Sequence, residues 1–347
     1  MLKYNKDLPC KSKRKGGVSN LNNPKLSIII PCYNAQKFLP SCFNCLDNQT
    51  YSNLQIIFID DGSTDNTLDL IKEYCQKKAN ALFVTGENQG VGASRNKGLE
   101  LIDGEYFTFY DADDIIFPTH FENLINIIVR ENADISACGI KRAKEERAKK
   151  LAYNDKGLNK LEIFEGKDCF TQYLSQEKLD FVLWNKVFST KILKESGAEF
   201  LNTRYGEEAY FLYNYFKCVK KVVFCPCKTY VYLQHKKSLM HLGFNESRLD
   251  IITNLDEIKK DAENFDKEIS SYVSSMRAGY LVGLLYFIKK SDYKNSQVIS
   301  QMIKTLTKDV KQLKGCKKTA LYKRVFIPLI PTFAKLALKK KLKNASK

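Results

Sequence analysis

Three carboxylates within four positions are the residues of this chain best suited to chemistry. Asp111, Asp113 and Asp114 directly follow residues 105–110, a mostly apolar and aromatic stretch that predicts a buried strand. A strand that ends in several carboxylates brings their oxygens to one place, and clustered oxygens are the ligands that Mg²⁺ and Mn²⁺ prefer. The alternative is a polar turn that caps the helix expected after Pro118, because Asp is also common at helix N-termini. Taken alone, the stretch supports both interpretations.

The surrounding sequence alternates short apolar runs with segments of helical pattern. Strands are predicted at residues 26–30, 54–59, 81–85, 105–110 and 134–140, and helices at 36–47, 66–77, 91–102 and 118–130. This alternation indicates βαβ units and a mainly parallel sheet flanked by helices. In such sheets ligands bind at the carboxyl ends of the strands. We therefore predict an α/β, Rossmann-like fold with its functional site along that edge.

Polar residues follow three of the predicted strands where each one ends. Cys32, Tyr33 and Asn34 follow the first strand, Asp60 and Asp61 follow the second, and the three carboxylates follow the fourth. Turns that only cap helices have no reason to share one edge of a sheet. This convergence favours a ligand site with a metal over simple capping.

The formal charge of +17 belongs to the two ends of the chain. Residues 1–25 carry seven Lys or Arg against one Asp, residues 303–347 carry fourteen against one Asp, and residues 26–302 sum to −2. Basic ends suit an anionic surface, either nucleic acid or the inner leaflet of a membrane. A nucleic-acid-binding function therefore competes, but a near-neutral body without a basic and aromatic stripe argues against it.

Apolar patterning and cysteine spacing predict a cytoplasmic protein with reduced thiols. No apolar run reaches the roughly 20 residues of a membrane span, and no apolar N-terminal segment indicates a secretory signal. Of the eleven cysteines, Cys42 and Cys45 form a CxxC within a predicted helix. Core packing is the favoured interpretation of this pair, because a structural zinc site usually needs two such pairs.

The turn after the first strand argues against two common nucleotide-binding classes. It reads Pro31-Cys-Tyr-Asn34, where a dinucleotide-binding dehydrogenase has GxGxxG, and the chain contains no GxxxxGK[ST] loop. A nucleotidyltransferase, the other enzyme considered, would need a glycine-rich and basic loop at the same place. The turn instead offers Tyr33, which can stack on a nucleobase. Asp61 can accept a hydrogen bond from a nucleobase N–H.

Six motifs in order across residues 26–120 resemble the family 2 inverting glycosyltransferases of GT-A fold, of the bacterial surface-polysaccharide type. They are Ile30-Pro-Cys-Tyr-Asn34, Gln49-Thr-Tyr51, Ile59-Asp-Asp-Gly-Ser-Thr-Asp65, Asn88-Gln-Gly90, Ala93-Ser-Arg-Asn96 with Gly98, and Asp111-Ala-Asp-Asp114. The resemblance is weaker over residues 160–240. There Trp184-Asn-Lys186 and Gly206-Glu-Glu208 are similar to the family's W-x-K and G-E-D segments. Beyond residue 245 we find nothing shared.

The resemblance implies a nucleotide-sugar donor, with a UDP-sugar favoured, and a pocket for its nucleobase. Pro31 and Tyr33 would line that pocket, with Tyr33 stacked on the base. Asp61 would bind the edge of the base. Arg95 would flank the nucleotide, where its guanidinium meets phosphate or orders Asp61.

The same resemblance implies a divalent metal, Mg²⁺ or Mn²⁺, that neutralises charge on the departing diphosphate. Asp113 would hold this metal, Asp111 would support the metal or the ribose, and Asp114 would stand behind them. A carboxylate on the opposite face would take the proton of the attacking acceptor hydroxyl. In the family this base is usually the Asp of the G-E-D segment. Glu208 stands at that position and is one methylene longer, and Glu207 is the alternative base. The alternative is that both only begin a helix, where acidic residues are favoured.

Three further residues are weighed on the acceptor side and beside the diphosphate. The resemblance assigns Trp184 and Lys186 to acceptor binding, although a single tryptophan fits core packing equally well. His235, which precedes Lys236-Lys-Ser238, is expected in a surface turn more than at the diphosphate.

Together these patterns predict three parts. Residues 1–25 form a basic disordered arm, and residues 26–240 form the GT-A domain, with donor binding at 26–120 and the acceptor side at 160–240. Residues 245–347 form an extension with helices near 248–263, 269–289 and 295–314. Its basic and apolar segment at 325–343 favours peripheral attachment to an anionic membrane over a packing helix, which suits a glycan or lipid-linked acceptor. The charge run at 141–150 is expected to be a solvated surface segment. Residues 160–240 show a mixed pattern, with short strands predicted near 181–188, 222–224 and 229–233 and helices near 167–175 and 206–217.

Overall fold

The computed structural model describes residues 23–145, 157–175, 178–179, 181–235 and 244–313. They belong to two compact units, each treated by itself. We call the first the sheet unit; its described part runs to Glu165 and resumes at 182–195 and 219–235. We call the second the helical unit; it contains 166–181, 196–218 and the described residues from 244 onward. The predicted acceptor side at 160–240 is thus divided between the two units.

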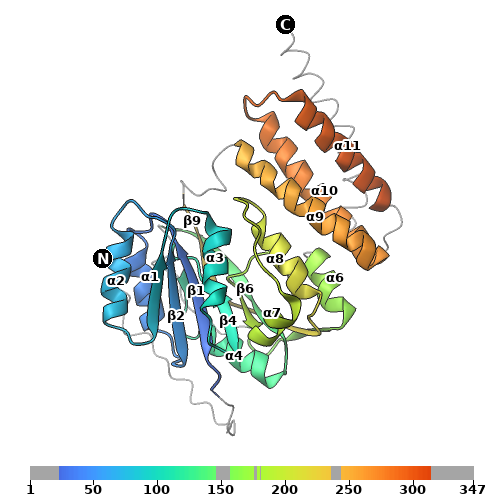
Figure 1. The fold of residues 1–347 in the computed structure, drawn as a ribbon. Coiled ribbons are helices and arrows are strands. Elements are labelled where there is room, and N and C mark those ends of the chain that lie inside the picture. The colour runs from blue at the N-terminus through green and yellow to red at the C-terminus, as the bar shows by residue number, and fades with distance from the viewer. Residues whose placement is uncertain (1–22, 146–156, 176–177, 180, 236–243, 314–347) are drawn as a thin grey trace. The chain divides into compact units, whose positions relative to one another are not determined.

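The sheet unit is built on nine strands (Figure 1). They are β1 Leu26–Cys32, β2 Leu54–Asp60, β3 Ala81–Thr85, β4 Tyr106–Phe109, β5 Ile115–Ile116, β6 Ile135–Lys144, β7 Glu162–Glu165, β8 Lys186–Ser189 and β9 Lys221–Gln234. Their order is β3-β2-β1-β4-β8-β6-β9-β5, with β7 paired to β9. The half from β3 to β4 is parallel throughout, as predicted. In the other half β8 runs antiparallel to β4 and β6, whereas β6 and β9 are parallel.

The helices of the sheet unit cover both faces of the sheet. They are α1 Leu39–Asp47, α2 Thr67–Gln76, α3 Val91–Glu100, α4 His120–Arg130 and α7 Thr190–Ser196, whose last residue belongs to the helical unit. Successive residues of a strand face opposite sides. Ile28 and Ile30 accordingly belong to one apolar cluster with residues of α1, α2 and α4. Ile29 faces α3, so closely that a Cβ on Gly98 would lie 2.3 Å from its Cγ2. The apolar run is therefore buried on both sides.

The long strand β9 corrects the prediction of two short strands near 222–224 and 229–233. Pro226 interrupts the pattern because it has no N–H to donate. The chain accommodates it with a register shift between Cys138 and Ile140 on β6. A Cβ on Gly139 would lie 2.9 Å from the carbonyl oxygen of Pro226, so glycine permits the close approach. The two predicted pieces are one bulged strand.

Part of the predicted solvated charge run is also strand. Residues 141–144 belong to β6, and Ala143 is buried, while residues 146–150 lie outside the described residues. The predicted strand at 181–188 is shorter and begins at Lys186. β5, β7 and α7 have no counterpart in the sequence-based assignment, because each is too short for a periodic pattern.

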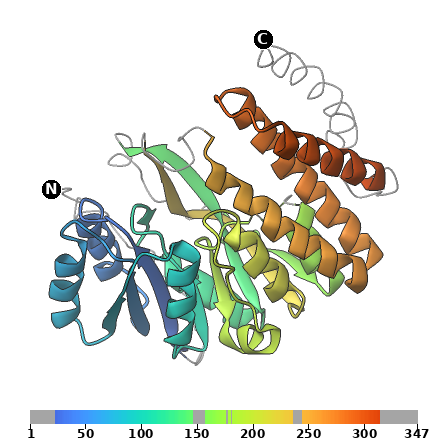
Figure 2. The ribbon, with the colours of Figure 1, turned by 45° about the horizontal axis from the view of Figure 1, so that its top comes forward.

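The helical unit contains α6 Lys167–Ser175, α8 Glu207–Phe216, a short 3-10 helix at Glu246–Leu249, α9 Asp250–Phe265, α10 Lys267–Lys289 and α11 Ser296–Leu313. Helices α9, α10 and α11 pack side by side (Figure 2). Asp266 begins α10 with its carboxylate accepting from the backbone N–H of Glu268 at 2.8 Å and of Ile269 at 2.9 Å. The three predicted C-terminal helices agree with α9, α10 and α11 to within two residues at each end.

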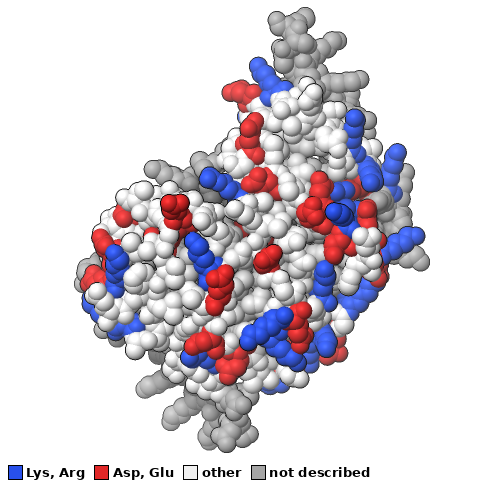
Figure 3. Space-filling model, viewed as in Figure 1, with Lys and Arg blue, Asp and Glu red and all other residues white. Residues whose placement is uncertain are grey.

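Charges of both signs are interspersed on the visible face of the described residues (Figure 3). None of the helices in the described part is long and apolar enough to cross a membrane.

Candidate donor and catalytic site

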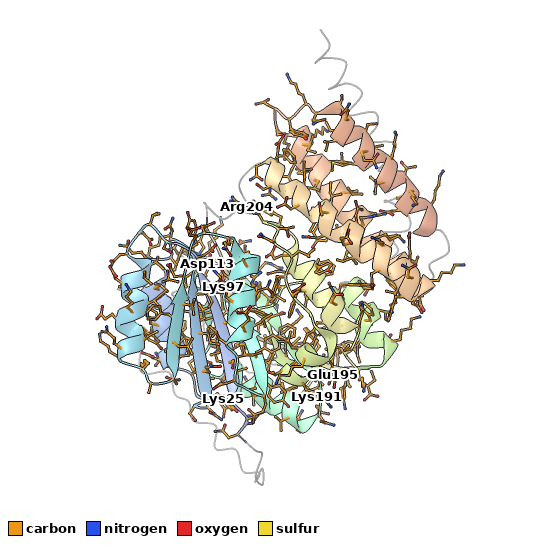
Figure 4. All side chains as sticks on the ribbon, in the orientation of Figure 1. Lys25, Lys97, Asp113, Lys191, Glu195 and Arg204 are labelled. Atoms are coloured by element: carbon orange, nitrogen blue, oxygen red, sulfur yellow. The ribbon has the colours of Figure 1, made fainter. Side chains whose placement is uncertain are left out.

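The carboxyl ends of β1, β2 and β4 bring the predicted donor residues to one edge of the sheet. Cys32 at the end of β1 is the registered partner of Asp60 at the end of β2. After β4, the backbone N–H of Tyr110 donates to the carbonyl of Ile29 at 3.0 Å, so the chain stays beside β1 up to the carboxylates. Figure 4 shows Asp113 at this edge. The predicted convergence at the strand ends is therefore what the parallel topology produces.

Asp61 is fixed at this edge by backbone hydrogen bonds. Its own N–H donates to the carbonyl of Cys32 at 2.9 Å. One carboxylate oxygen accepts from the N–H of Gln89 and the other from the N–H of Gly90, each at 2.9 Å. Gly62 has φ +72°, and a Cβ there would lie 2.8 Å from the N of Asn88, so only glycine lets the two loops meet. Each carboxylate oxygen of Asp61 keeps a second lone pair for a ligand.

Tyr33 offers its aromatic face next to Asp61's strand end. Its exposed fraction is 53%, and Pro31 before it is partly buried at the end of β1. Asn34 holds the turn in shape: it adopts φ +49°, and its Oδ1 accepts from the N–H of Thr64 at 2.8 Å. A large exposed aromatic ring on a rigid turn suits stacking on a planar ligand.

Arg95 pairs with the first carboxylate of the acidic turn. Its Nη2 lies 3.6 Å from Oδ1 of Asp111, and its guanidinium carbon lies 5.9 Å from the centroid of the Phe109 ring. Burial raises the pKa of Asp111, and the positive charge of Arg95 opposes this shift. The sequence-based expectation paired Arg95 with a donor phosphate or with Asp61, whereas its ion pair in the structure is with Asp111.

Asp113 is the most accessible carboxylate of the turn, with a side-chain exposed fraction of 42%. Burial and the negative charge of Asp111 raise its pKa to about 6, against the opposing effect of His235 and Lys37. A raised carboxylate pKa beside a second carboxylate marks a place where a cation would be favourable.

This turn suits a metal held jointly with a ligand. Within the part of the chain that the structure describes, no three His, Cys, Asp or Glu side chains gather closely enough to hold a metal by themselves. Mg²⁺ is commonly bound through one or two carboxylates plus substrate phosphates. Asp113 and Asp111 supply the two carboxylates of such a site, so these residues fit the metal that the family resemblance implies.

Asp114 faces the interior of the sheet unit and is 1% exposed. Its Oδ1 accepts from the N–H of Leu233 and its Oδ2 from the hydroxyl of Tyr230, each at 2.8 Å. Burial and the charges of Asp111 and Asp113 raise its pKa to about 9. Asp114 thus ties the acidic turn to β9.

His235 is buried, so the expected surface turn is wrong. Its Nε2 lies 3.3 Å from the carbonyl oxygen of Asp113 and 3.8 Å from that residue's Oδ2. Its ring packs against Phe38 with centroids 4.9 Å apart. The signal that could have found it is the inward alternation of Val231 and Leu233 along β9, which His235 continues. Lys236, the next residue, lies outside the described residues.

Trp184 and Lys186, predicted on the acceptor side, are both buried in the sheet unit. The indole of Trp184 stacks on Tyr230 with centroids 4.3 Å apart. Lys186 is 0% exposed, and its ammonium donates to the carbonyl of Val182 at 2.6 Å and to Oδ1 of Asn185 at 2.8 Å. Packing and hydrogen bonding account for both side chains. Their acceptor-binding roles find no support in this geometry.

The two candidate bases lie in the first turn of α8, in the helical unit. Gly206 before them has φ +80°, and a Cβ there would lie 1.9 Å from Cδ1 of Ile251, so glycine is required. Glu207 is buried and Glu208 is half-buried. Burial and the charges of Glu208 and Glu207 raise the pKa of Tyr280 on α10. This position is compatible with a base and with a helix start.

A separate surface recess lies away from this chemistry. It is lined by residues at the amino end of β4 and on α7, among them Glu105, Lys191 and Glu195. Figure 4 shows Lys191 and Glu195 at the opposite end of the sheet unit from Asp113. Its mixed charges indicate no particular ligand.

Comparisons with known proteins agree with the fold and the motifs. The Glycosyl transferase family 2 model matches residues 27–195. An uncharacterized glycosyltransferase of Haemophilus influenzae is 33% identical over 230 residues, which are 64% of this chain and 81% of that protein. A poly(ribitol-phosphate) beta-glucosyltransferase of Bacillus spizizenii is 29% identical over 214 residues, 60% of this chain and 32% of its own length. The chain spans 32%, 64% and 64% of three other curated relatives.

Solved structures extend the likeness in fold. The crystal structure of Staphylococcus aureus TarS 1–349 in complex with UDP-GlcNAc has a TM-score of 0.64 at 18% identity, covering 90% of this chain and 88% of that one. This coverage reaches beyond residue 245, where the sequence alone showed nothing shared. The sheet flanked by helices is the GT-A fold that the motifs predicted. On the matching motifs and the Haemophilus influenzae relative, the chain belongs to glycosyl transferase family 2.

Proposed function

We propose that this chain is an inverting, metal-dependent glycosyltransferase that moves a sugar from a nucleotide-sugar, with a UDP-sugar favoured, to a hydroxyl group of a glycan or lipid-linked acceptor. The observation that carries the proposal is the shared sheet edge, where Asp61 and the pair Asp111 and Asp113 follow parallel strands. TarS was solved with UDP-GlcNAc, which supports a uridine nucleotide for this chain too.

The nucleoside would bind between Tyr33 and Asp61. Tyr33 stacks on the base, and Asp61, whose two backbone hydrogen bonds fix its carboxylate, accepts from a base N–H. Because the backbone holds Asp61 in place before the donor arrives, binding costs little additional ordering of this group.

The diphosphate would lie at the acidic turn with a divalent cation on Asp113 and Asp111. When bound, this cation would neutralise the negative charge that develops on the departing diphosphate. The chain's own residues prepare this place. Arg95 orients Asp111, Asp114 ties the turn to β9, and His235 stands within reach of Asp113.

The acceptor hydroxyl needs a base on the other face of the sugar, and we assign this role to Glu208 with Glu207 as the rival. In-line attack on the anomeric carbon inverts its configuration while the base takes the hydroxyl proton. Both glutamates stand at the start of α8. Gly206, directly before them, adopts a left-handed backbone conformation that only glycine tolerates here. This fixed local geometry suits a group that must be held in position.

One relative and the composition of the C-terminal residues support the proposed acceptor and location. The poly(ribitol-phosphate) beta-glucosyltransferase is named for a polymeric acceptor. This supports a role for the present chain in surface polysaccharide or glycolipid assembly. Residues 303–347 carry fourteen Lys or Arg and one Asp, and most of them lie outside the described residues. We assign them to peripheral binding at the inner face of the cytoplasmic membrane. Deleting residues 320–347 should release the protein from anionic liposomes, and unchanged co-sedimentation would refute this attachment.

A thermal-shift panel of nucleotide-sugars with Mn²⁺ tests the proposed donor binding directly. A true donor stabilises the folded state by mass action, so the UDP-sugars should raise the melting temperature more than GDP- or CDP-sugars. Asp61→Ala should lose this stabilisation. A panel in which no nucleotide-sugar shifts the wild type would overturn the proposal.

A further inference from the structure

His235 is held on three sides next to Asp113. Phe38 lies against its ring, and Nε2 faces the carbonyl oxygen of Asp113 at 3.3 Å and its Oδ2 at 3.8 Å. The other ring nitrogen, Nδ1, lies 3.3 Å from Oε2 of Glu145. The imidazole therefore stands between two carboxylates, one in the turn after β4 and one just after the end of β6.

The strand register explains how Glu145 comes to this place. Lys144 and Gln234 are the last registered pair of the parallel strands β6 and β9. Glu145 directly follows β6 and His235 directly follows β9, so the two residues lie next to each other where the chain leaves the sheet. Glu145 is 71% exposed, whereas His235 is 7% exposed. Only the histidine end of this pair is sheltered from solvent.

We propose that Glu145 is a positioning residue that orients His235 toward the donor's diphosphate and its cation; this inference rests on the proposed function. Nδ1 of His235 lies against a carboxylate oxygen of Glu145 and Nε2 lies against the carbonyl oxygen of Asp113, so the two contacts together fix the plane of the ring. A carboxylate on the far nitrogen commonly fixes the ring orientation of a histidine at a metal site. Glu145 itself touches neither substrate nor cation.

The exposure of Glu145 separates this role from a general charge effect. An exposed carboxylate attracts a cation weakly through water and salt. Its influence should therefore depend on His235 and disappear when the imidazole is absent. This dependence is the property to measure.

Mn²⁺ binding to the full chain, followed by the free-ion EPR signal in the presence of UDP, gives a readout that needs no turnover. Glu145→Ala should raise the Mn²⁺ dissociation constant by about tenfold, the lower end of what lost orienting partners cost. Glu145→Gln should have a smaller effect, because its amide can still form a hydrogen bond with Nδ1. Glu100→Gln, an exposed change on α3 that also removes one negative charge, should have none.

A double-mutant cycle with His235→Ala decides whether Glu145 acts through the histidine. Glu145→Ala should add nothing in the His235→Ala background. An equal loss in both backgrounds would mean that Glu145 acts by charge alone and would overturn the inference. If Asp113→Ala and His235→Ala weaken Mn²⁺ binding while Glu145→Ala does not, the inference is wrong and the proposed metal site stands. If Asp113→Ala leaves Mn²⁺ binding unchanged, the proposed metal site fails first.

Discussion

The sheet unit and the helical unit use buried charge in opposite ways. In the sheet unit, backbone N–H groups hold the carboxylate of Asp61, and the Asp113 side chain at a neighbouring strand end is 42% exposed. In the helical unit, Arg277 donates to both oxygens of Asp309 at 2.7 Å each and joins α10 to α11. Asp309 is 0% exposed. The carboxylate of Asp309 is therefore used up by its ion pair, whereas that of Asp113 remains accessible to solvent.

The largest effect expected from breaking this contrast is at Asp113 in the sheet unit. Asp113→Ala should lower Mn²⁺-dependent donor hydrolysis by about 10³-fold, because charge neutralisation by a metal contributes several kcal/mol to the transition state. The melting temperature should stay close to that of the wild type, since this side chain is 42% exposed. Asp69→Ala on the exposed side of α2 is the matched control. Retained hydrolysis in Asp113→Ala would remove the metal assignment.

Glu208→Gln should separate donor binding from transfer. The amide keeps the shape but cannot take a proton, so transfer to an acceptor should fall by about 10²-fold or more while UDP binding is unchanged. Glu207→Gln is the paired comparison. If Glu207→Gln is inactive and Glu208→Gln retains transfer, the base is Glu207. If both retain transfer, the two glutamates only begin α8.

Asp309→Ala should destabilise the helical unit without touching donor chemistry. It leaves the Arg277 guanidinium buried without its bidentate partner, which costs about 3–5 kcal/mol. Asp256→Ala removes a half-exposed partner of the same arginine and should cost only about 1 kcal/mol. Denaturant unfolding followed by circular dichroism gives both values. Equal costs would show that burial does not set the strength of this network.

The last prediction is a pH dependence of stability from His120 in the sheet unit. This residue is 0% exposed, its Nδ1 lies 2.8 Å from Oγ1 of Thr229, and burial lowers its pKa to about 3. Below pH 6.5 the unfolded chain binds a proton that the folded chain does not, so stability falls as pH falls from about 6.5 toward 3. Between pH 7 and pH 5 the loss should be about 2 kcal/mol.

His120→Gln removes this titration and provides the test. The difference in unfolding free energy between pH 7 and pH 5, measured in urea, should be smaller in His120→Gln than in the wild type by about that amount. An unchanged difference would show that the folded chain accommodates a charged His120.

Much of the sheet edge at the carboxyl ends of β1, β2 and β4 could be predicted, because it depends on short-range sequence patterns. The apolar run of β1 is buried on both faces, so its sequence is continuous and its end is clear at Pro31-Cys-Tyr-Asn34. Parallel topology then places every strand end at the same edge. Gly62 and Gly206 mark two positions with a positive φ that other residues do not tolerate there.

The burial of His235 could not be predicted from the sequence, for a physical reason. A polar side chain at the end of a strand is expected at the surface, because isolated burial of such a group costs several kcal/mol. His235 is buried because partners from distant parts of the chain receive it, namely Oε2 of Glu145 and the carbonyl oxygen of Asp113. A one-dimensional pattern contains no information about such partners.

The sequence by itself determined the order of strands and helices from β1 to β4, the acidic turn at 111–114, the turn at 31–34 that carries Tyr33, and the family. Only the tertiary structure decided that Asp114 faces inward, that His235 stands beside Asp113, and that Trp184 packs on Tyr230. Local periodicity and turn chemistry fix which elements form. Burial and partner choice depend on contacts between residues far apart along the chain, and these exist only once the sheet has assembled.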